Sequence, residues 1–178
     1  MHFLAAVAAT LALAAPADSN VAPCDKAIVG HGPADWRSES IVAGPVGVRR
    51  HPLSAMSRAA NGWYTTKMGL LIEGREPETV TVSVPPPLRH RVFLFYGEVL
   101  DRNGDPTTSF HNTRGYGETE FQLCGNKPRT IWPGGIKVKG DAPVRLNVFT
   151  EDRTKPFILR LGKPTVYEPP GNYSSPRA

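Results

Sequence analysis

Alternating hydrophobic and polar residues mark several strands along the chain. The clearest run is Glu78 to Val84, where three valines alternate with threonine and serine before three consecutive prolines. The same alternation recurs from Val144 to Val148 and from Phe157 to Leu161. Because successive side chains of a strand point to opposite faces of a sheet, each run predicts a half-buried strand.

Five further segments complete the expected set of strands. Met68 to Ile72 and Val92 to Tyr96 are apolar at nearly every position, which is typical of strands covered on both faces. Ser40 to Val48, Thr119 to Cys124 and Ile131 to Val138 are also strand-like. Turn-rich connections separate these runs, so we expect an all-β domain, a single Greek-key-like β-sandwich of about seven or eight strands.

Helix has little room in this sequence. The 178 residues include 18 prolines and 17 glycines, which interrupt the chain every few positions. The only helical candidate is Leu53 to Ala60, a short run that stops at Asn61-Gly62. We therefore expect at most one short helix.

The N-terminal segment has the pattern of a cleavable signal peptide. An apolar and small-residue run extends from Phe3 to Ala15 and ends at Pro16, although no basic residue precedes it. A spanning helix needs about 20 apolar residues, so this run is too short to remain as an anchor. Cleavage after Ala14 or Ala17 would follow an A-x-A pattern.

The sequence predicts a division of the chain into three parts and a compartment for the protein. We expect residues 1–17 to be a signal peptide, residues 18–164 to form the β-sandwich domain and residues 165–178 to be a Pro-rich disordered tail. No later segment is long and apolar enough to serve as a transmembrane anchor of the mature chain. The protein is therefore predicted to be secreted or extracytoplasmic.

Two cysteines, Cys24 and Cys124, remain after signal removal. An oxidising compartment favours their pairing, and on the chain-entropy model a loop of about 100 residues stabilises the fold by up to about 4–5 kcal/mol. A lipid anchor on Cys24 is the alternative, but Pro23 replaces the small residue that a lipobox requires. Strand alternation would place Cys124 on a polar face with Glu120, so the bond would hold the N-terminal segment across the outside or along the edge of a sheet.

The formal charge of +5 favours anionic partners. It arises from 21 Lys and Arg against 16 Asp and Glu. Most basic residues are scattered, as on an ordinary solvated face, apart from Leu88-Arg89-His90-Arg91 and the pair Lys137 and Lys139. We expect an anionic envelope polymer or a carbohydrate as partner, and no nucleic acid.

No metal or cofactor site is expected. Asp101-Arg102-Asn103-Gly104-Asp105 resembles the start of a calcium loop, but Pro106 and Asn112 stand where an EF-hand needs glycine and glutamate. A tight turn after the preceding strand explains Asn103-Gly104 better. The four histidines beyond the signal lack the spacing of a zinc site; they are His31, His51, His90 and His111.

No catalytic residue is expected either. Gly-x-Ser-x-Gly does not occur. Cys124, with Arg129 and either His90 or His111, could mimic the trio of a sortase-like cysteine transpeptidase. The Thr-Leu-x-Thr-Cys signature is missing, and a catalytic cysteine must be free and activated. A count of free thiols separates this hypothesis from the disulfide.

Three tryptophans leave two interpretations open. Trp36, Trp63 and Trp132 could line a sugar-binding face, because aromatic rings stack on the apolar faces of sugars. Most tryptophans in a domain of this size are core residues instead. Burial of all three would exclude a carbohydrate-binding module of this kind, whereas an exposed one would support it.

Short motifs spread over the chain resemble one family. They are Trp36-Arg37, Ala43-Gly44-Pro45-Val46, Thr79-Val80-Thr81-Val82, Phe121-Gln122-Leu123-Cys124 and Trp132-Pro133-Gly134-Gly135-Ile136. In this order they resemble a family of uncharacterised exported proteins of high-GC Gram-positive bacteria. That resemblance implies a cysteine near the mature N-terminus, another before the Gly-Gly turn and often a third after it. Pro143 stands near the third position, which leaves Cys24 as the partner of Cys124.

The sequence thus favours a non-enzymatic exported β-sandwich that binds a partner at or outside the cell envelope, through its loops or a basic face. A carbohydrate-binding module that uses an exposed tryptophan is one alternative. The Cys124 transpeptidase is the other.

Overall fold

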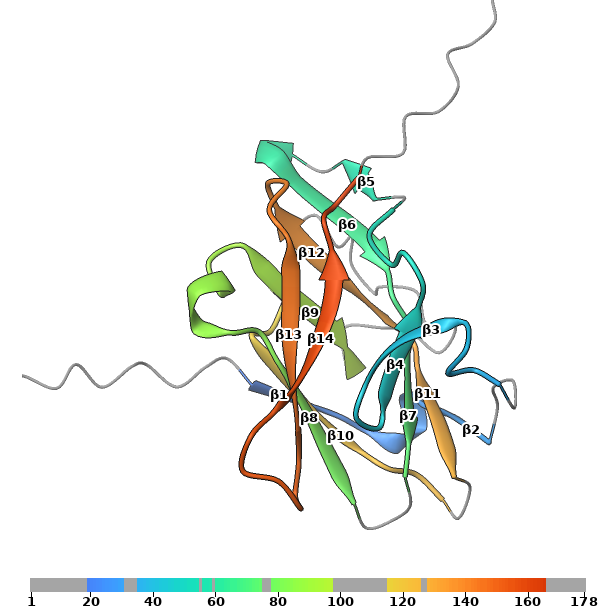
Figure 1. Ribbon diagram of the computed structural model, residues 1–178. Helices are drawn as coiled ribbons and strands as arrows, with labels where there is room; N and C mark the ends of the chain where they lie inside the picture. Colours follow the sequence, from blue (N-terminus) through green and yellow to red (C-terminus); the bar gives the residue numbers. More distant parts are fainter. Residues whose placement is uncertain are drawn as a thin grey trace, which may run out of the picture.

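The computed structural model describes residues 19–30, 35–54, 56–58, 60–74, 78–97, 115–125 and 128–165. These residues are all-β, as predicted, with fourteen strands in three sheets (Figure 1). The predicted signal peptide, the Asp101–Asp105 turn, His31, His111 and the C-terminal tail from residue 166 lie outside the described residues. In the described ranges the helices are single 3-10 turns, none of which could span a bilayer; they are η1 (Cys24–Lys26), η2 (Ala60–Gly62) and η3 (Pro86–Leu88).

Sheet I has the order β1-β10-β8-β13-β14. Its strands are β1 (Ser19–Ala22), β10 (Glu118–Gln122), β8 (Thr79–Ser83), β13 (Val144–Thr150) and β14 (Phe157–Gly162). All neighbours pair antiparallel except β1, which runs parallel to β10 at the edge. The alternation that predicted β8, β13 and β14 is confirmed, because Val80, Val82, Leu146, Val148 and Leu159 are buried.

Sheet II has the order β2-β11-β7-β4-β3. Its strands are β2 (Ile28–Val29), β11 (Arg129–Trp132), β7 (Leu70–Glu73), β4 (Val46–Arg49) and β3 (Ser40–Ala43). The expectation of one strand from Ser40 to Val48 was wrong. Gly44 adopts a left-handed φ of 60°, which glycine tolerates best, and with Pro45 it turns the chain back on itself as the β3–β4 hairpin.

Sheet III has the order β5-β6-β12-β9. Its strands are β5 (Ser57–Arg58), β6 (Trp63–Lys67), β12 (Gly134–Lys139) and β9 (Val92–Tyr96). The helix expected over Leu53 to Ala60 was wrong, because Ser57 and Arg58 pair antiparallel with Thr65 and Tyr64 of β6. Pairing with a neighbouring strand has overridden the weak helical preference of this segment.

Sheets II and III are joined by two bent strands. β6 passes into β7 at Met68-Gly69, and β11 passes into β12 at Pro133, so the β6–β12 pairing continues as the β7–β11 pairing. The Met68 amide donates to the Gly134 carbonyl across this bend at 2.8 Å. Proline cannot donate a ladder hydrogen bond, which explains why the strand expected from Ile131 to Val138 is two strands.

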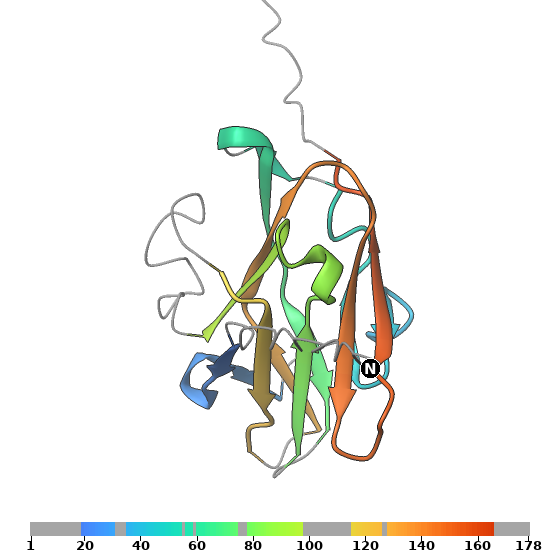
Figure 2. The ribbon, with the colours of Figure 1, turned by 90° about the vertical axis from the view of Figure 1, so that its left-hand side faces the viewer.

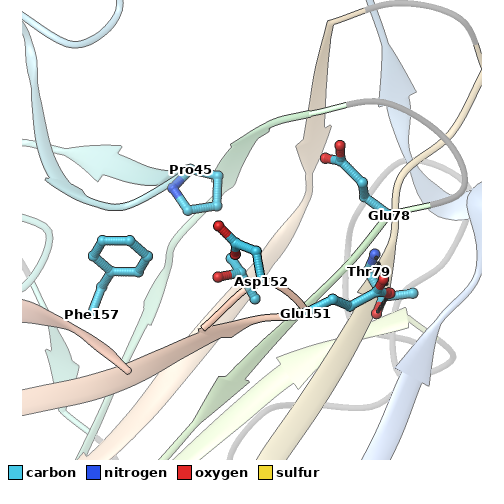
Figure 3. Close-up of a pocket in the computed structure, with 7 residues that line it drawn as sticks. Pro45, Glu78, Thr79, Glu151, Asp152 and Phe157 are labelled. Carbon is cyan, nitrogen blue, oxygen red and sulfur yellow. Dashed lines mark hydrogen bonds between the residues drawn. The ribbon is translucent and has the colours of Figure 1, made fainter. Parts of the chain in front are cut away.

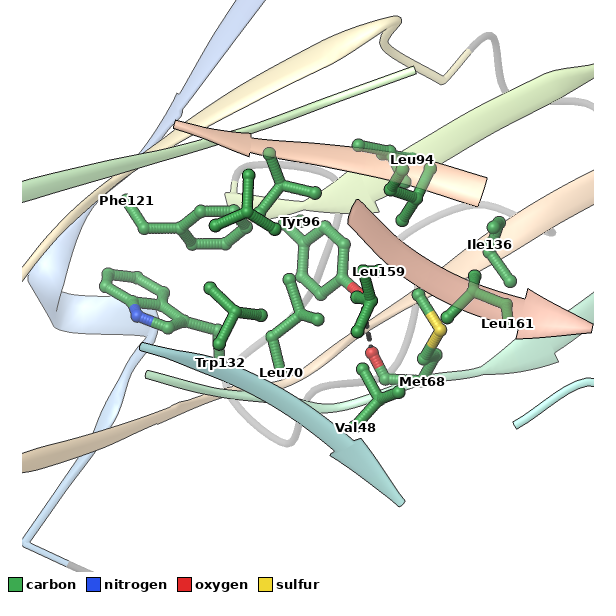
Figure 4. Packing of buried hydrophobic residues seen from close by; sticks show 14 of the residues in the cluster. Val48, Met68, Leu70, Leu94, Tyr96, Phe121, Trp132, Ile136, Leu159 and Leu161 are labelled. Carbon is green, nitrogen blue, oxygen red and sulfur yellow. Dashed lines mark hydrogen bonds between the residues drawn. The ribbon is translucent and has the colours of Figure 1, made fainter. Parts of the chain in front are cut away.

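The core lies between the inner faces of the three sheets. Tyr96, Phe121 and Trp132 pack edge to face in its centre, with ring centroids 5.2 and 5.4 Å apart (Figure 4). The Tyr96 hydroxyl donates to the Met68 carbonyl at 2.6 Å. Complete burial raises the pKa of this hydroxyl far above its ordinary value, so the side chain stays neutral.

The N-terminal strand is fastened to the edge of sheet I. Cys24 and Cys124 form the predicted disulfide, with their Cα atoms 5.6 Å apart. Beyond the backbone pairing of β1 with β10, the Asn20 side-chain amide donates to the Tyr96 carbonyl at 2.7 Å. Figure 2 shows this blue segment beside β10. The N-terminal segment therefore protects a sheet edge, as the sequence predicted.

The expected position of Cys124 needs correction. Thr119, Phe121 and Leu123 share a buried face, as predicted. However, β10 ends at Gln122, so its alternation does not extend to Cys124, which is 3% exposed and belongs to the core cluster. The disulfide is thus buried at its Cys124 end and exposed at Cys24.

Candidate ligand-binding face

Cysteine catalysis as hypothesised would need a free thiol at Cys124. Both described cysteines are bonded to each other, so neither has a free thiol. The Arg129 guanidinium lies 3.7 Å from the Glu73 carboxylate in sheet II. His90 is exposed in the turn after η3. The disulfide removes the nucleophile on which the transpeptidase hypothesis depends.

The basic segment Leu88-Arg89-His90-Arg91 serves mainly to hold neighbouring backbone. Arg89 donates to the Val84 carbonyl at 3.0 Å, and Arg91 donates to the Pro143 carbonyl at 3.1 Å. Further bonds from Arg91 reach the carbonyls of Lys139 and Ala142. Both guanidinium groups therefore close the connections beside β8 and β12.

The three tryptophans differ in burial. Trp36 is 2% exposed and Trp132 is 1% exposed, so both are buried, although only Trp132 belongs to the central core cluster. Trp63 is half-buried at the start of β6. Its neighbour Tyr64 packs against the core, so Trp63 lies on the outer face of sheet III. Of the three tryptophans, Trp63 alone retains the exposure that ligand contact needs.

Trp63 belongs to an aromatic-basic cluster, which we define as Trp63, Phe93, Lys137 and Lys139. Cross-strand register brings these residues together: Lys139 is opposite Trp63, and Lys137 is opposite Phe93. The Trp63 and Phe93 rings are 5.5 Å apart at a tilt of 37°. The ammonium nitrogens of Lys137 and Lys139 lie 5.2 and 5.8 Å from the centre of the Trp63 ring.

This cluster combines two kinds of recognition chemistry. The accessible part of the half-buried indole offers a flat apolar surface, while two ammonium groups within cation–π distance offer charge. Partial burial lowers the pKa of Lys137 from its ordinary value, because desolvation disfavours the charged form. An acidic group placed beside Lys137 would counteract that desolvation. Sequence reasoning identified Trp63 and the lysine pair separately, and the fold places them on one surface.

Sequence reasoning missed a second basic site at the bend between β6 and β7. A hollow of about 410 Å³ is lined there by Arg49, Arg50, His51 and Lys67, with Gly69 and Met68 beside them. A neighbouring hollow of about 270 Å³ shares Arg49 and Gly69 with it. We call the two together the Gly69 groove. The contiguous basic residues Arg49-Arg50-His51 were the available signal in the sequence.

The second half of the Gly69 groove is less polar. Its lining includes Leu71 of β7 and Ile131 of β11, both half-buried on the outer face of sheet II. The Trp36 ring forms another wall and covers Gly47, where a Cβ would collide with the indole. Glu39 and Ser40 also line this half, so the groove joins a cationic end to a mixed end with apolar side chains and one carboxylate.

A third hollow, of about 390 Å³, is acidic. Glu78, Glu151 and Asp152 line it together with Thr79 and Phe157 (Figure 3). Glu151 accepts hydrogen bonds from the Thr79 hydroxyl at 2.9 Å and from the Thr79 amide at 3.3 Å. These bonds connect the β13–β14 turn to the start of β8, which gives Glu151 a structural role.

Within the described ranges, no three His, Cys, Asp or Glu side chains come together in a way that could hold a metal ion. Comparison with protein-family models, curated proteins and solved structures finds no significant match to this chain.

Proposed function

We propose that this protein is an exported, non-enzymatic binding module that recognises an acidic polysaccharide through the aromatic-basic cluster. The observation that carries the proposal is the position of two lysine ammonium groups within 6 Å of one half-buried tryptophan ring. A sugar ring stacks on the indole, while its carboxylate or a similar anionic group pairs with the lysines.

The ligand class follows because the ligand must use both the indole surface and the lysine charges. A neutral sugar would make no use of the positive charge of the two lysines, and a simple anion would leave the indole unused. The net charge of +5 attracts a polyanion from a distance, with a strength that salt screens. This proposal joins two sequence hypotheses, the basic face and the exposed tryptophan.

Export is part of the proposal. Disulfides persist in oxidising compartments, and the Cys24–Cys124 bond fits a protein that acts outside the cytoplasm. Signal cleavage after Ala14 or Ala17 would leave β1 whole, because β1 starts at Ser19. The terminal residue of protein recovered outside cells would test the cleavage site. Protein that retains residues 1–17 would contradict it.

We also propose that the domain is a variant of the predicted sandwich. Sheet I would form one layer, and sheets II and III, joined through the bent strands, would form the other. Buried residues of all three sheets belong to one hydrophobic cluster, which supports this arrangement. The outer face of sheet III would then be the free side of the second layer.

Calorimetric titration with oligogalacturonate and its methyl ester tests the function. The two ligands share the sugar ring and differ in charge. We expect the acid to bind and the ester to bind at least tenfold more weakly, because charged hydrogen bonds contribute about 1.5–3 kcal/mol. Trp63→Ala should weaken binding of the acid by about tenfold or more, as for an aromatic anchor.

The lysines need a matched control for overall charge. Lys139→Ala should weaken binding several-fold, whereas Lys155→Ala should not, because Lys155 is an exposed lysine in the β13–β14 connection. Thermal unfolding of each variant checks that the fold is intact. Equal losses for the two lysine variants, or full binding by folded Trp63→Ala, would rule out recognition by the cluster.

A further inference from the structure

We infer that the Gly69 groove is a second binding site, which takes one anionic sugar unit with its charged group among Arg49, Arg50 and Lys67. The sugar ring would lie over Gly69 toward Leu71 and Ile131. The ligand class rests on the proposed function, but the site itself is separate from the aromatic-basic cluster.

The charge of the groove supports an anionic ligand. The larger hollow has four basic side chains and no carboxylate among its lining residues, and the smaller hollow has one carboxylate, Glu39. Arg49 and Arg50 are exposed, and in the described part of the chain neither guanidinium is paired with a carboxylate. Arginine presents several donors in a planar fork, which suits carboxylate and phosphate oxygens. These two residues can therefore bind an oxyanion without breaking an existing ion pair.

Gly69 keeps the floor of the groove open. A Cβ built on Gly69 would meet nothing closer than the Trp132 carbonyl at 3.8 Å and the Ile131 side chain at 3.9 Å. Because glycine has no side chain, the two hollows meet above this residue. Opposite Lys67 on β12 stands Gly135, which likewise presents no side chain. The two glycines, Gly69 and Gly135, therefore help to keep the groove open.

The basic wall is held by an unusual backbone conformation. His51 is not a glycine, yet its φ is 55°. Such left-handed residues cost about 1 kcal/mol or more and persist where the surroundings enforce them. The Ser54 hydroxyl and amide both donate to the His51 carbonyl, at 2.8 and 3.1 Å. This turn fixes the direction of the chain directly after Arg49 and Arg50.

The apolar side chains in the second half of the groove are the reason for proposing a sugar ring in the ligand. Leu71 and Ile131 are cross-strand partners on β7 and β11, and both remain half-buried. A sugar ring has apolar faces, so it can cover such a surface while its charged group remains at the arginines. A free inorganic anion would use the arginines and leave this surface uncovered.

Amide NMR of the labelled protein tests the groove. Trigalacturonate should shift the Gly69 and Arg49 amide signals. The neutral trimethyl ester should leave both nearly unchanged, and inorganic phosphate at the same concentration should shift Arg49 less and leave Gly69 nearly unchanged, because it does not reach over the groove floor. Gly69→Val should weaken binding in the groove by about tenfold, because it fills the floor without changing the charge. Arg49→Gln should weaken it several-fold, and Arg145→Gln, an exposed arginine on sheet I, serves as its control.

The Trp63 indole signal separates the two proposals. Both variants of the groove should keep the Trp63 shift induced by trigalacturonate. A Trp63 shift without shifts at Gly69 would refute the groove and leave the proposed function standing. Shifts at Gly69 without one at Trp63 would refute the proposed function alone. Equal shifts with phosphate would refute the sugar assignment, and an unchanged groove affinity in folded Gly69→Val and Arg49→Gln would refute the site.

Discussion

Lys139 stands directly across from Trp63 on neighbouring strands, and its ammonium nitrogen lies 5.8 Å from the centre of the indole ring. Lys137, two residues before Lys139 on β12, approaches the same ring. Because side chains alternate along a strand, the two lysines and the tryptophan share one face of sheet III.

The pH dependence of ligand binding should report Lys137. Partial burial lowers its pKa from the ordinary value of 10.5, so this lysine loses its proton at a lower pH than a fully solvated lysine does. Affinity for oligogalacturonate should therefore begin to fall below pH 10.5. In Lys137→Arg the fall should shift to higher pH, since arginine stays protonated. Identical pH profiles of Kd for the two proteins would exclude a part for Lys137.

Removal of the disulfide should loosen the N-terminal strand first. The double variant Cys24→Ser/Cys124→Ala avoids a buried hydroxyl at position 124, and we expect it to lose about 2–4 kcal/mol of unfolding free energy. Amide exchange should accelerate most in β1, which pairs with only one strand. Urea unfolding and hydrogen-exchange mass spectrometry measure the two effects. Unchanged exchange in β1 would show that backbone pairing alone fixes it.

The buried hydrogen bond of Tyr96 should matter at neutral and alkaline pH. Tyr96→Phe leaves the Met68 carbonyl without its donor, so stability at pH 7 should fall by about 1–3 kcal/mol. The pKa of Tyr96 is raised in the folded state, so above its ordinary value of 10.0 only the unfolded chain releases this proton. Wild-type stability should therefore decline as pH rises above 10, and the decline should be smaller in the variant.

Urea unfolding at several pH values measures both quantities. The wild type and Tyr96→Phe should converge in stability as the solution becomes more alkaline. A constant difference between them across this range would contradict the role given to the buried hydroxyl.

Two glycines near the bend should differ in their sensitivity to substitution by alanine. A Cβ at Gly134 would collide with the Tyr96 ring and lie 2.6 Å from the Phe95 carbonyl, so Gly134→Ala should destabilise by about 1–3 kcal/mol. Gly69→Ala should change stability by about 0.5 kcal/mol at most, because the added methyl has room. Thermal unfolding compares the pair. Similar losses would show that the Gly69 floor is not open.

Local patterns predicted the strands well where burial itself alternates. Val80, Val82 and Leu159 each occupy the buried face that period-2 spacing assigns to them. The all-β class and the cysteine pairing also followed from composition and chain order. These features depend on short-range regularity or on a pair with one possible partner, which is why they could be predicted without coordinates.

Breaks within strands were harder to predict. The Gly44-Pro45 turn and the Pro133 bend lie inside runs that remain apolar on both sides, so hydrophobicity alone does not locate them. The Leu53 to Ala60 segment has helix-forming residues, and only the presence of β6 beside it makes Ser57 and Arg58 a strand. A change in chain direction or a neighbouring strand decided each case.

The sequence by itself determined that this chain alternates into β-strands, avoids long helices and has two cysteines to pair. Only the tertiary structure decided which tryptophan stays accessible, because burial of Trp36 depends on Gly47 beneath its ring. It also decided that Arg49 and Gly69 line the same groove. Alternation along a strand is local, whereas the neighbours of a side chain are set by strand pairing between distant segments.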